Sequence, residues 1–309
     1  MILSAGLTPA WQQILVFESF RYGEVNRAAE AHWCASGKVF NAGIGVHHLG
    51  AESLTLAVAG GPPLVQIRAE MQSLGVPIDV VETESATRVC TTILDRSTGT
   101  MTELVENGRP VSESELDAFE VRFAEKANKA GVVILIGTLP KGTPPTYYRR
   151  LLQHVTCPTV LDIRGEGLLG VLDLEPTIIK PNREELAQTV GHELASDEAL
   201  IDAMRSLNER GAQWVVITDG PDSVWLTSRT ETWRFQPPSV PKAEVVNPIG
   251  CGDSMAAALA KAVSDGIPIP EALRFGIAAS VDNLHQLLPC RLDPSRIRNI
   301  ADSIQSQRL

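Results

Sequence analysis

Short apolar runs recur through the middle of the chain, and each one stops at a polar or glycine-containing turn. The clearest runs are residues 132–136 before Gly137, 159–163 before Arg164, 177–179 before Lys180, and 214–218 before Asp219. Apolar runs of this length without polar alternation are typical of parallel strands that are buried on both faces.

Helical patterns lie between these runs. Ser112 to Glu115 predicts a capping box at the start of a helix, Asn182 begins a second helix, residues 197–210 form a third that ends at Gly211, and residues 253–264 form a fourth. Alternating strands and helices predict a doubly wound, mostly parallel α/β sheet in a single domain spanning residues 1–309. Ligands of such sheets bind at the carboxyl ends of the strands, so the turns named above are the places to look for a site.

Two segments have a different pattern. Residues 14–34 and 87–105 are strand-like and contain turn residues, among them Thr98-Gly99. They predict a small β-strand lid outside the main sheet. Lid strands with an exposed apolar face often pair between subunits, which favours a homodimer through the lid.

Composition narrows the functional classes. The chain has 309 residues, of which 44% are hydrophobic, and a net charge of −10 without a long basic run. These values argue against nucleic acid or a membrane surface as the main partner, and no apolar stretch is long enough to span a bilayer. The five cysteines are scattered without a C-x-x-C pair, and the N-terminus lacks the pattern of a signal peptide, so a cytoplasmic protein with reduced thiols is expected.

The turn at residues 247–254 carries the strongest chemical signal. Val245-Val246 leads into Asn247-Pro248-Ile249-Gly250-Cys251-Gly252-Asp253-Ser254, and a run of small helix-forming residues follows. Glycines allow close backbone approach and positive φ, and the first N–H groups of a helix favour an anion. Asp253 beside such an anion hole is either a general base or only a helix-start residue, and the residues alone leave both interpretations open.

This motif resembles the second signature of the PfkB (ribokinase-like) carbohydrate kinases, whose usual form is close to N-T-V-G-A-G-D-S. Further matching stretches follow in family order along nearly the whole chain: residues 23–28, 35–41, 87–88, 137–140, 180–185 and 218–220. The branch it resembles most is the 1-phosphofructokinase and tagatose-6-phosphate kinase group. The resemblance implies a three-layer α/β/α ribokinase-like fold with a lid, ATP and Mg²⁺ as cofactors, and phosphorylation of a hydroxyl on a phosphosugar such as fructose 1-phosphate or tagatose 6-phosphate.

The resemblance also implies roles for individual residues. Asp253 is the catalytic base, and the backbone of Gly250, Cys251 and Gly252 forms the anion hole. The acceptor is expected to contact Gln12, Gly37, Lys38, Asn41, Arg88 and Thr138. The nucleotide is expected near Lys180, Asn182, Glu185, Thr218, Gly220 and Asn283, with Glu185 holding Mg²⁺ indirectly through water.

The sequence departs from the family pattern on the acceptor side. Gln12 stands where the family has an aspartate that grips sugar hydroxyls, and a neutral amide is a weaker acceptor. Val39 replaces a glycine and cannot comfortably adopt positive φ, so a reshaped sugar loop is expected if that backbone is required. Arg164 adds a cation between Asp162 and Glu166.

Three alternatives to the simplest interpretation follow from these residues. The chain could be a non-catalytic or weakly active sensor of a sugar phosphate or nucleotide that descends from such a kinase. A second alternative keeps the kinase but gives it an unphosphorylated acceptor. A third concerns Cys251, whose thiol at a helix N-terminus is either reactive, with a lowered pKa, or a small residue in place of alanine.

Overall fold

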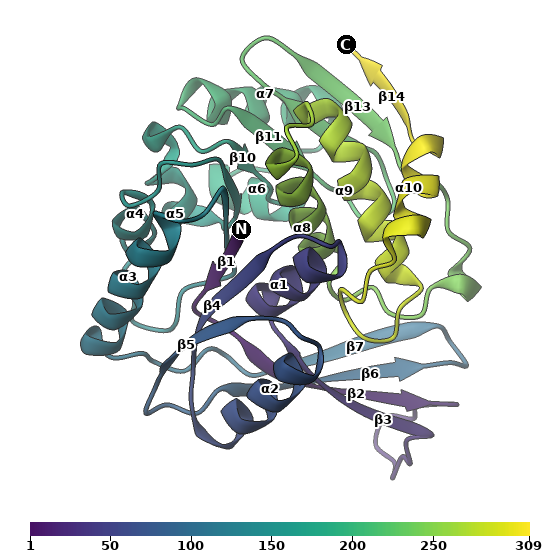
Figure 1. The fold of residues 1–309 in the computed structure, drawn as a ribbon. Helices are drawn as coiled ribbons and strands as arrows, with labels where there is room; N and C mark the ends of the chain where they lie inside the picture. Colours follow the sequence, from purple (N-terminus) through teal and green to yellow (C-terminus); the bar gives the residue numbers. More distant parts are fainter.

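The main sheet of the computed structural model, which describes residues 1–309, contains ten strands in the order β14-β13-β12-β11-β10-β9-β8-β1-β4-β5 (Figure 1). The parallel strands are β1 (Ile2–Gly6), β4 (Ser53–Ala59), β5 (Ile78–Glu82), β8 (Val132–Ile136), β9 (Thr159–Asp162), β10 (Ile178–Ile179) and β11 (Trp214–Ile217). Three antiparallel strands complete one edge: β12 (Val224–Thr227), β13 (Thr232–Gln236) and β14 (Gln305–Arg308). The prediction of a mostly parallel sheet is confirmed.

Helices cover both faces of this sheet and make three layers. One face carries α1 (Lys38–His48), α2 (Gly61–Ser73), α8 (Cys251–Ser264), α9 (Ile269–Leu284) and α10 (Pro294–Ser303). The other carries α3 (Glu113–Ala127), α4 (Tyr147–Leu152), α5 (Gly165–Leu169), α6 (Arg183–Val190) and α7 (Asp197–Glu209). Two short 3-10 helices, Leu172–Leu174 and Lys242–Glu244, lie in connections. None of the helices combines the length and the apolar character that crossing a lipid bilayer requires.

The central strand β8 shows why its sequence has no polar alternation. Val133 and Leu135 belong to the core beneath α3, whereas Val132 and Ile134 belong to the core beneath α8. Both faces are buried, so every position of the strand must be apolar.

The helix boundaries follow the capping signals. The Ser112 side chain accepts a hydrogen bond from the Glu115 N–H, and the Glu115 side chain accepts one from the Ser112 N–H, as the predicted capping box requires. Helix α7 ends at Glu209, close to the predicted stop, while α8 begins at Cys251, two residues earlier than its pattern suggested.

A second sheet of four strands lies to one side of the main sheet (Figure 1). It is ordered β3-β2-β6-β7 and consists of β2 (Ala10–Phe17), β3 (Glu30–Ser36), β6 (Arg88–Asp95) and β7 (Thr100–Val105). Two antiparallel hairpins, β2–β3 and β6–β7, join through a parallel pairing of β2 with β6. This is the expected lid sheet, and its first strand starts at Ala10, earlier than the sequence pattern indicated.

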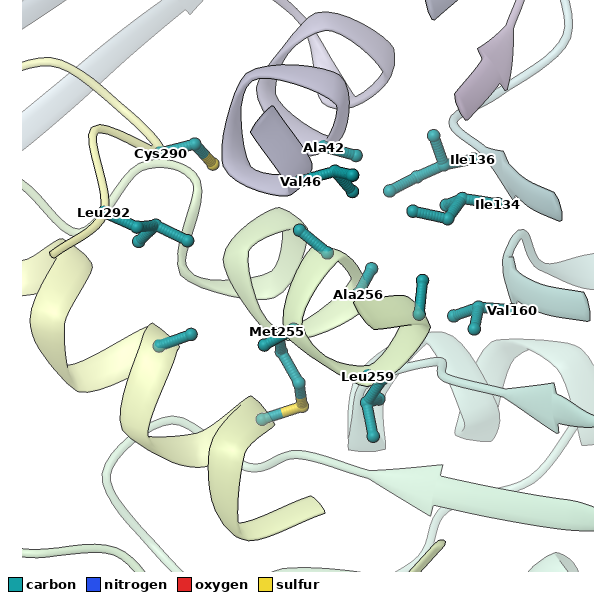
Figure 2. Close-up of a cluster of buried hydrophobic side chains, with 14 of the residues drawn as sticks. Ala42, Val46, Ile134, Ile136, Val160, Met255, Ala256, Leu259, Cys290 and Leu292 are labelled. Atoms are coloured by element: carbon teal, nitrogen blue, oxygen red, sulfur yellow. The ribbon is translucent and has the colours of Figure 1, made fainter. Parts of the chain in front are cut away.

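Helix α8 is the element that carries the 250–253 turn, and it is held by small and apolar side chains. Figure 2 shows Ala256 of α8 directed toward Val46 of α1 and Ile134 of the sheet, while Leu259 points away from α1. Leu259 packs close to Gly276 of α9. Small side chains let α8 approach both neighbours closely, and close packing makes the position of its first turn rigid.

Candidate active site

The turn before α8 presents unpaired backbone donors. Gly250 is the N-cap residue of α8 and has φ 87°, a left-handed conformation that favours glycine. The Cys251 N–H bonds to the Pro248 carbonyl at 3.4 Å, and the Ser254 N–H bonds to the Gly250 carbonyl at 2.8 Å. The N–H groups of Gly252 and Asp253 donate to no acceptor in the protein, so they are available to an anion.

Buried side chains support this turn from behind. Asn283 is fully buried; its amide donates to the Ile249 carbonyl at 2.8 Å, and its Oδ1 accepts the Cys290 N–H at 2.7 Å. The Asn247 amide donates to the Leu287 carbonyl at 2.8 Å. The polar atoms of Asn283, which the sequence predicted near the adenine, bond to the backbone on either side of this turn.

Asp253 is buried with its carboxylate oriented by a neighbouring amide. Asn41 of α1 donates from Nδ2 to Asp253 Oδ2 at 2.8 Å, and Ser36 donates to Asn41 Oδ1 at 3.1 Å, which fixes the orientation of that amide. Burial raises the pKa of the Asp253 carboxyl to about 6, although the positive charge of Lys38 opposes the rise. A carboxylate with this pKa is suited to accept a proton near neutral pH.

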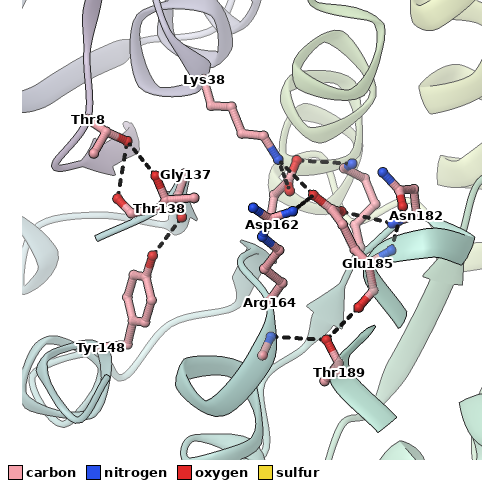
Figure 3. Close-up of polar contacts among 12 residues, drawn as sticks. Thr8, Lys38, Gly137, Thr138, Tyr148, Asp162, Arg164, Asn182, Glu185 and Thr189 are labelled. Atoms are coloured by element: carbon pink, nitrogen blue, oxygen red, sulfur yellow. Dashed lines mark hydrogen bonds and ion pairs between the residues drawn. The ribbon is translucent and has the colours of Figure 1, made fainter. Parts of the chain in front are cut away.

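A second buried carboxylate, Asp162 at the end of β9, binds two lysines (Figure 3). Lys38 Nζ lies 2.7 Å from Asp162 Oδ1, and Lys180 Nζ lies 3.0 Å from Asp162 Oδ2. Burial alone would raise the pKa of Asp162, but Lys180 and Lys38 outweigh it and the pKa is lowered. Lys180 Nζ also lies 3.4 Å from the place that a Cβ on Gly252 would occupy, so it borders the anion hole.

Asn182 and Glu185 form a capping box at the start of α6. The Glu185 N–H donates to Asn182 Oδ1 at 2.7 Å, and the Asn182 N–H donates to Glu185 Oε2 at 3.0 Å. The other oxygen of Glu185 points toward Lys38, at 3.8 Å, and Arg164, at 3.7 Å (Figure 3). Asn182 and Glu185 therefore stabilise the start of α6, and one carboxylate oxygen of Glu185 remains directed at Lys38 and Arg164.

A cavity of about 590 Å³ opens beside the turn. It is lined by residues of the β11–β12 turn, the segment after β13, and the first turns of α8 with the last turns of α9, including Thr218, Gly220, Val240, Pro248, Gly252 and Val281. Its apolar walls and its contact with Gly252 suit a nucleotide base and its phosphates. Thr218 and Gly220 line this cavity, and Asn283 does not.

The predicted acceptor residues are divided between two environments. Gln12 is buried on the inner face of the lid, where its amide donates to Thr92 at 2.7 Å. Arg88 is fixed at the lid base, because its guanidinium donates to the carbonyls of Pro9, Thr8 and Glu106 at 3.1–3.2 Å.

Gly37 and Thr138 lie on either side of the Thr8 backbone. Gly37 has φ 78° and leaves only 2.9 Å between the place of a Cβ and the Thr8 carbonyl oxygen, so a side chain does not fit there. The Thr8 hydroxyl donates to the Thr138 carbonyl at 3.1 Å. The structure thus brings both residues to the segment that joins β1 to the lid.

Two questions that the sequence left open concern Val39 and Cys251. Val39 does not require positive φ; it lies in the first turn of α1, buried against Gly6, and the left-handed residue is Gly37. Cys251 is not an activated thiol, because burial raises its pKa to about 11. Arg164, by contrast, reaches the cleft through its ion pair with Glu185.

Motif reasoning assigned no role to Asp162, which the structure places at the centre of the charged cluster. The signal was present in the sequence, since Asp162 and Lys180 follow neighbouring parallel strands and must meet at the same sheet edge. Cys290 was missed as well, and its contacts to Ser254 and Asn283 leave no mark in the sequence pattern.

The chain matches the pfkB family carbohydrate kinases over residues 2–284. The protein belongs to this family and is a carbohydrate kinase, a class that uses ATP.

Solved structures share its fold. A possible 1-phosphofructokinase from Thermotoga maritima aligns with a TM-score of 0.89 and 20% identity, covering 100% of this chain and 99% of that chain. The tetrameric inhibited form of phosphofructokinase-2 from Escherichia coli aligns with a TM-score of 0.88 and 22% identity, covering 98% of each chain. Arabidopsis thaliana ribokinase complexed with ribose and ATP aligns with a TM-score of 0.73 and 21% identity, covering 97% of this chain and 98% of that chain. At these identities the similarity shows the ribokinase-like fold.

Proposed function

We propose that this carbohydrate kinase transfers the γ-phosphoryl group of ATP to a hydroxyl of a phosphosugar, with Asp253 as general base. The observation that supports the proposal best is the buried Asp253 carboxylate, oriented by Asn41 beside the unpaired N–H groups of Gly252 and Asp253. A base and an anion hole on the same helix turn are what in-line phosphoryl transfer needs.

The proposed transfer moves one phosphoryl group and one proton. The acceptor oxygen forms a bond to the γ-phosphorus while the bond from that phosphorus to the β–γ bridging oxygen breaks. The acceptor proton goes to Asp253, and the negative charge on the equatorial oxygens is stabilised by the N–H groups of the turn and by Lys180.

The nucleotide side suits ATP with magnesium. The cavity beside Gly252 would hold the base, and the phosphates would run past Thr218 and Lys180 toward the turn. No three acidic, histidine or cysteine side chains gather to form a direct metal site. Glu185 has one oxygen whose nearest cations are 3.7 Å away, which fits a metal held through water and nucleotide phosphates. When bound, Mg²⁺ would neutralise phosphate charge.

A phosphorylated acceptor, of the fructose 1-phosphate or tagatose 6-phosphate type, is favoured by cations at the cleft. Arg164 is 49% exposed and can turn toward an added phosphate, while Lys38, bound to Asp162, adds positive charge beside it. Arginine and lysine are the usual partners of substrate phosphates.

The test is a coupled ADP-release assay over ketose and aldose phosphates and their unphosphorylated counterparts, with and without Mg²⁺. The wild-type kcat/KM should fall about tenfold per pH unit below pH about 6, because the base is then protonated. Asp253→Asn should lower kcat by roughly a hundredfold or more. Asp265→Asn, at the exposed other end of α8, is the matched control and should retain the wild-type rate. A near-normal rate in Asp253→Asn would refute the general base.

A sensor without turnover is the second candidate, and the lid favours it. Each nitrogen of the Arg88 guanidinium donates to a main-chain carbonyl, and the Gln12 amide nitrogen donates to Thr92 within the lid, so both side chains are engaged by the protein itself. The sensor predicts saturable binding of a sugar phosphate with no ADP release across the panel.

Two further features belong to the proposal. A homodimer through the lid is supported by β7, all of whose residues are exposed, including Leu104 and Val105, and by the half-exposed Trp33 on the opposite edge strand. The molar mass in solution tests it. A cytoplasmic location is supported by five unpaired cysteines.

A further inference from the structure

Charged side chains from α1, β9 and the segment after β10 meet between the lid and the cavity beside Gly252. Lys38 is the first residue of α1 and follows the lid strand β3 by two residues. Lys180 follows β10 on the nucleotide side, and Asp162 ends the neighbouring strand β9. Figure 3 shows the long Lys38 side chain reaching down from α1 to Asp162.

Each oxygen of Asp162 binds a different lysine. Lys38 lies 2.7 Å from Oδ1 and Lys180 lies 3.0 Å from Oδ2, so one carboxylate sets the separation of two ammonium groups. Asp162 is 2% exposed and Lys180 is 4% exposed, so their contact is shielded from solvent, whereas the Lys38 side chain is partly exposed. Two like charges beside an anion hole would repel each other without the carboxylate between them.

We propose that Asp162 is a positioning residue that holds Lys38 and Lys180 as a pair on the two sides of the transferring phosphoryl group. The proposal rests on the proposed transfer at Asp253. Lys180 borders Gly252 of the anion hole, while Lys38 comes from the element that joins the lid to the core. Asp162 thus connects the acceptor half of the cleft to the donor half without contacting either substrate.

Asp162 also acts on the base through its charge. The titratable groups that face Asp253 are Lys38 of α1, Asp162 of β9, Lys180 after β10, and the thiols of Cys251 and Cys290. Burial raises the pKa of both thiols, so they remain neutral. The negative charge of Asp162 helps to raise the pKa of Asp253, and the two lysines lower it.

The experiment uses Asp162→Asn, an amide of nearly the same shape without the charge. The first measurement is independent of turnover: lysines are reductively methylated with formaldehyde and cyanoborohydride, and the labelled peptides are quantified. Lys38, whose side chain is partly exposed, should react several-fold faster in Asp162→Asn, because loss of the carboxylate releases its amine and lowers its pKa, which Asp162 now raises against the opposing effect of burial. Lys261, paired with Asp265 on the surface, is the internal control and should react at the same rate in both proteins.

The second measurement is the pH profile of kcat/KM. The acid limb of Asp162→Asn should move to lower pH by roughly one unit, since a like charge near Asp253 is removed. In Lys180→Met the acid limb should move the other way. A purely structural role would lower activity in both variants and leave the limb in place. Asp173→Asn removes a carboxylate bound to Arg149 on the surface and should change neither measurement.

Asp162→Glu keeps the charge and guards against a failure of Asp162→Asn to fold. Its acid limb should remain at the wild-type pH while kcat falls about tenfold, because the longer side chain displaces both ammonium groups. Wild-type lysine labelling in folded Asp162→Asn, or a wild-type kcat in Asp162→Glu, would overturn the proposal. A normal rate in Asp253→Asn would instead remove the general base and leave the labelling result standing.

Discussion

The region around Asp253, Asn41 and Asp162, called the transfer side below, differs from the lid in how its polar side chains are held. On the transfer side, Asp253, Asn41 and Asp162 are buried on the ends of rigid strands and helices and bond to side chains from distant elements. In the lid, Gln12 bonds to the adjacent strand and Arg88 bonds to main-chain carbonyls. The polar side chains around Asp253 are therefore fixed by packing between distant elements, whereas those of the lid are fixed by local contacts within it.

This difference suggests that the reaction and the choice of acceptor depend on different parts of the molecule. The reaction depends on groups whose positions are fixed by packing, which explains why the family motif around Asp253 is complete. Under the proposed function, the choice of acceptor would depend on the lid, where Gln12 stands in place of the family aspartate. Substitutions on the transfer side should act on every acceptor equally, and substitutions in the lid should act on some acceptors more than others.

The largest effect should come from Gly250→Ala. Its φ of 87° is unfavourable for alanine, and the new Cβ would lie 2.9 Å from Pro289 Cβ. We expect kcat to fall about a hundredfold for all acceptors, as loss of anion-hole donors does elsewhere, and the free energy of unfolding to fall by about 2 kcal/mol or more. Gly191→Ala, with φ 81° and nothing within 4 Å of the new Cβ, isolates the backbone cost and should keep its rate. If the loss of rate in Gly250→Ala differed between acceptors, the transfer side and the lid would not have separate roles.

A second prediction concerns the stability of Asp253→Asn. The folded pKa of about 6 lies above the usual value of 3.8, so the charged carboxylate destabilises the fold as pH rises through this interval. Replacing it with a neutral amide should raise the free energy of unfolding by up to about 3 kcal/mol at pH 8, since one pKa unit is about 1.4 kcal/mol. The gain should vanish below pH about 4. Urea unfolding at several pH values measures it, and a less stable variant at pH 8 would show that Asp253 is not strained by burial.

The smallest effect should come from Gln12→Asp, which restores a carboxylate in the lid. We expect the KM for the acceptor to change severalfold, with different factors for different sugars, and kcat to change little, because a charged acceptor strengthens hydrogen bonds to hydroxyls. Gln13→Asp lies on the opposite face of the same strand and is the matched control. Equal changes for all acceptors would place Gln12 outside the acceptor site.

The sequence predicted the transfer side better than the lid. The strand runs, the capping boxes at Ser112 and Asn182, and the turn at Gly250 depend on residues close together in the chain, where local preferences act. The lid hairpins were also visible, but their residues could not be assigned contacts. Asn283 and Arg88 show why: an amide or a guanidinium fits a ligand or a backbone carbonyl equally well, and only the surrounding packing selects one.

By itself the sequence determined the fold class and the place of Asp253 in the turn before α8, because hydrophobic period, helix capping and glycine positions follow from local physical chemistry. The motif around Asp253 also carried the family resemblance. Only the tertiary structure decided which groups surround that base. Lys38 meets Asp162 across 124 positions of the chain, and Asn41 meets Asp253 across 212. Such contacts depend on how strands are ordered in the sheet and how α1 packs on α8, and the pKa of Asp253 depends on the burial that this packing produces.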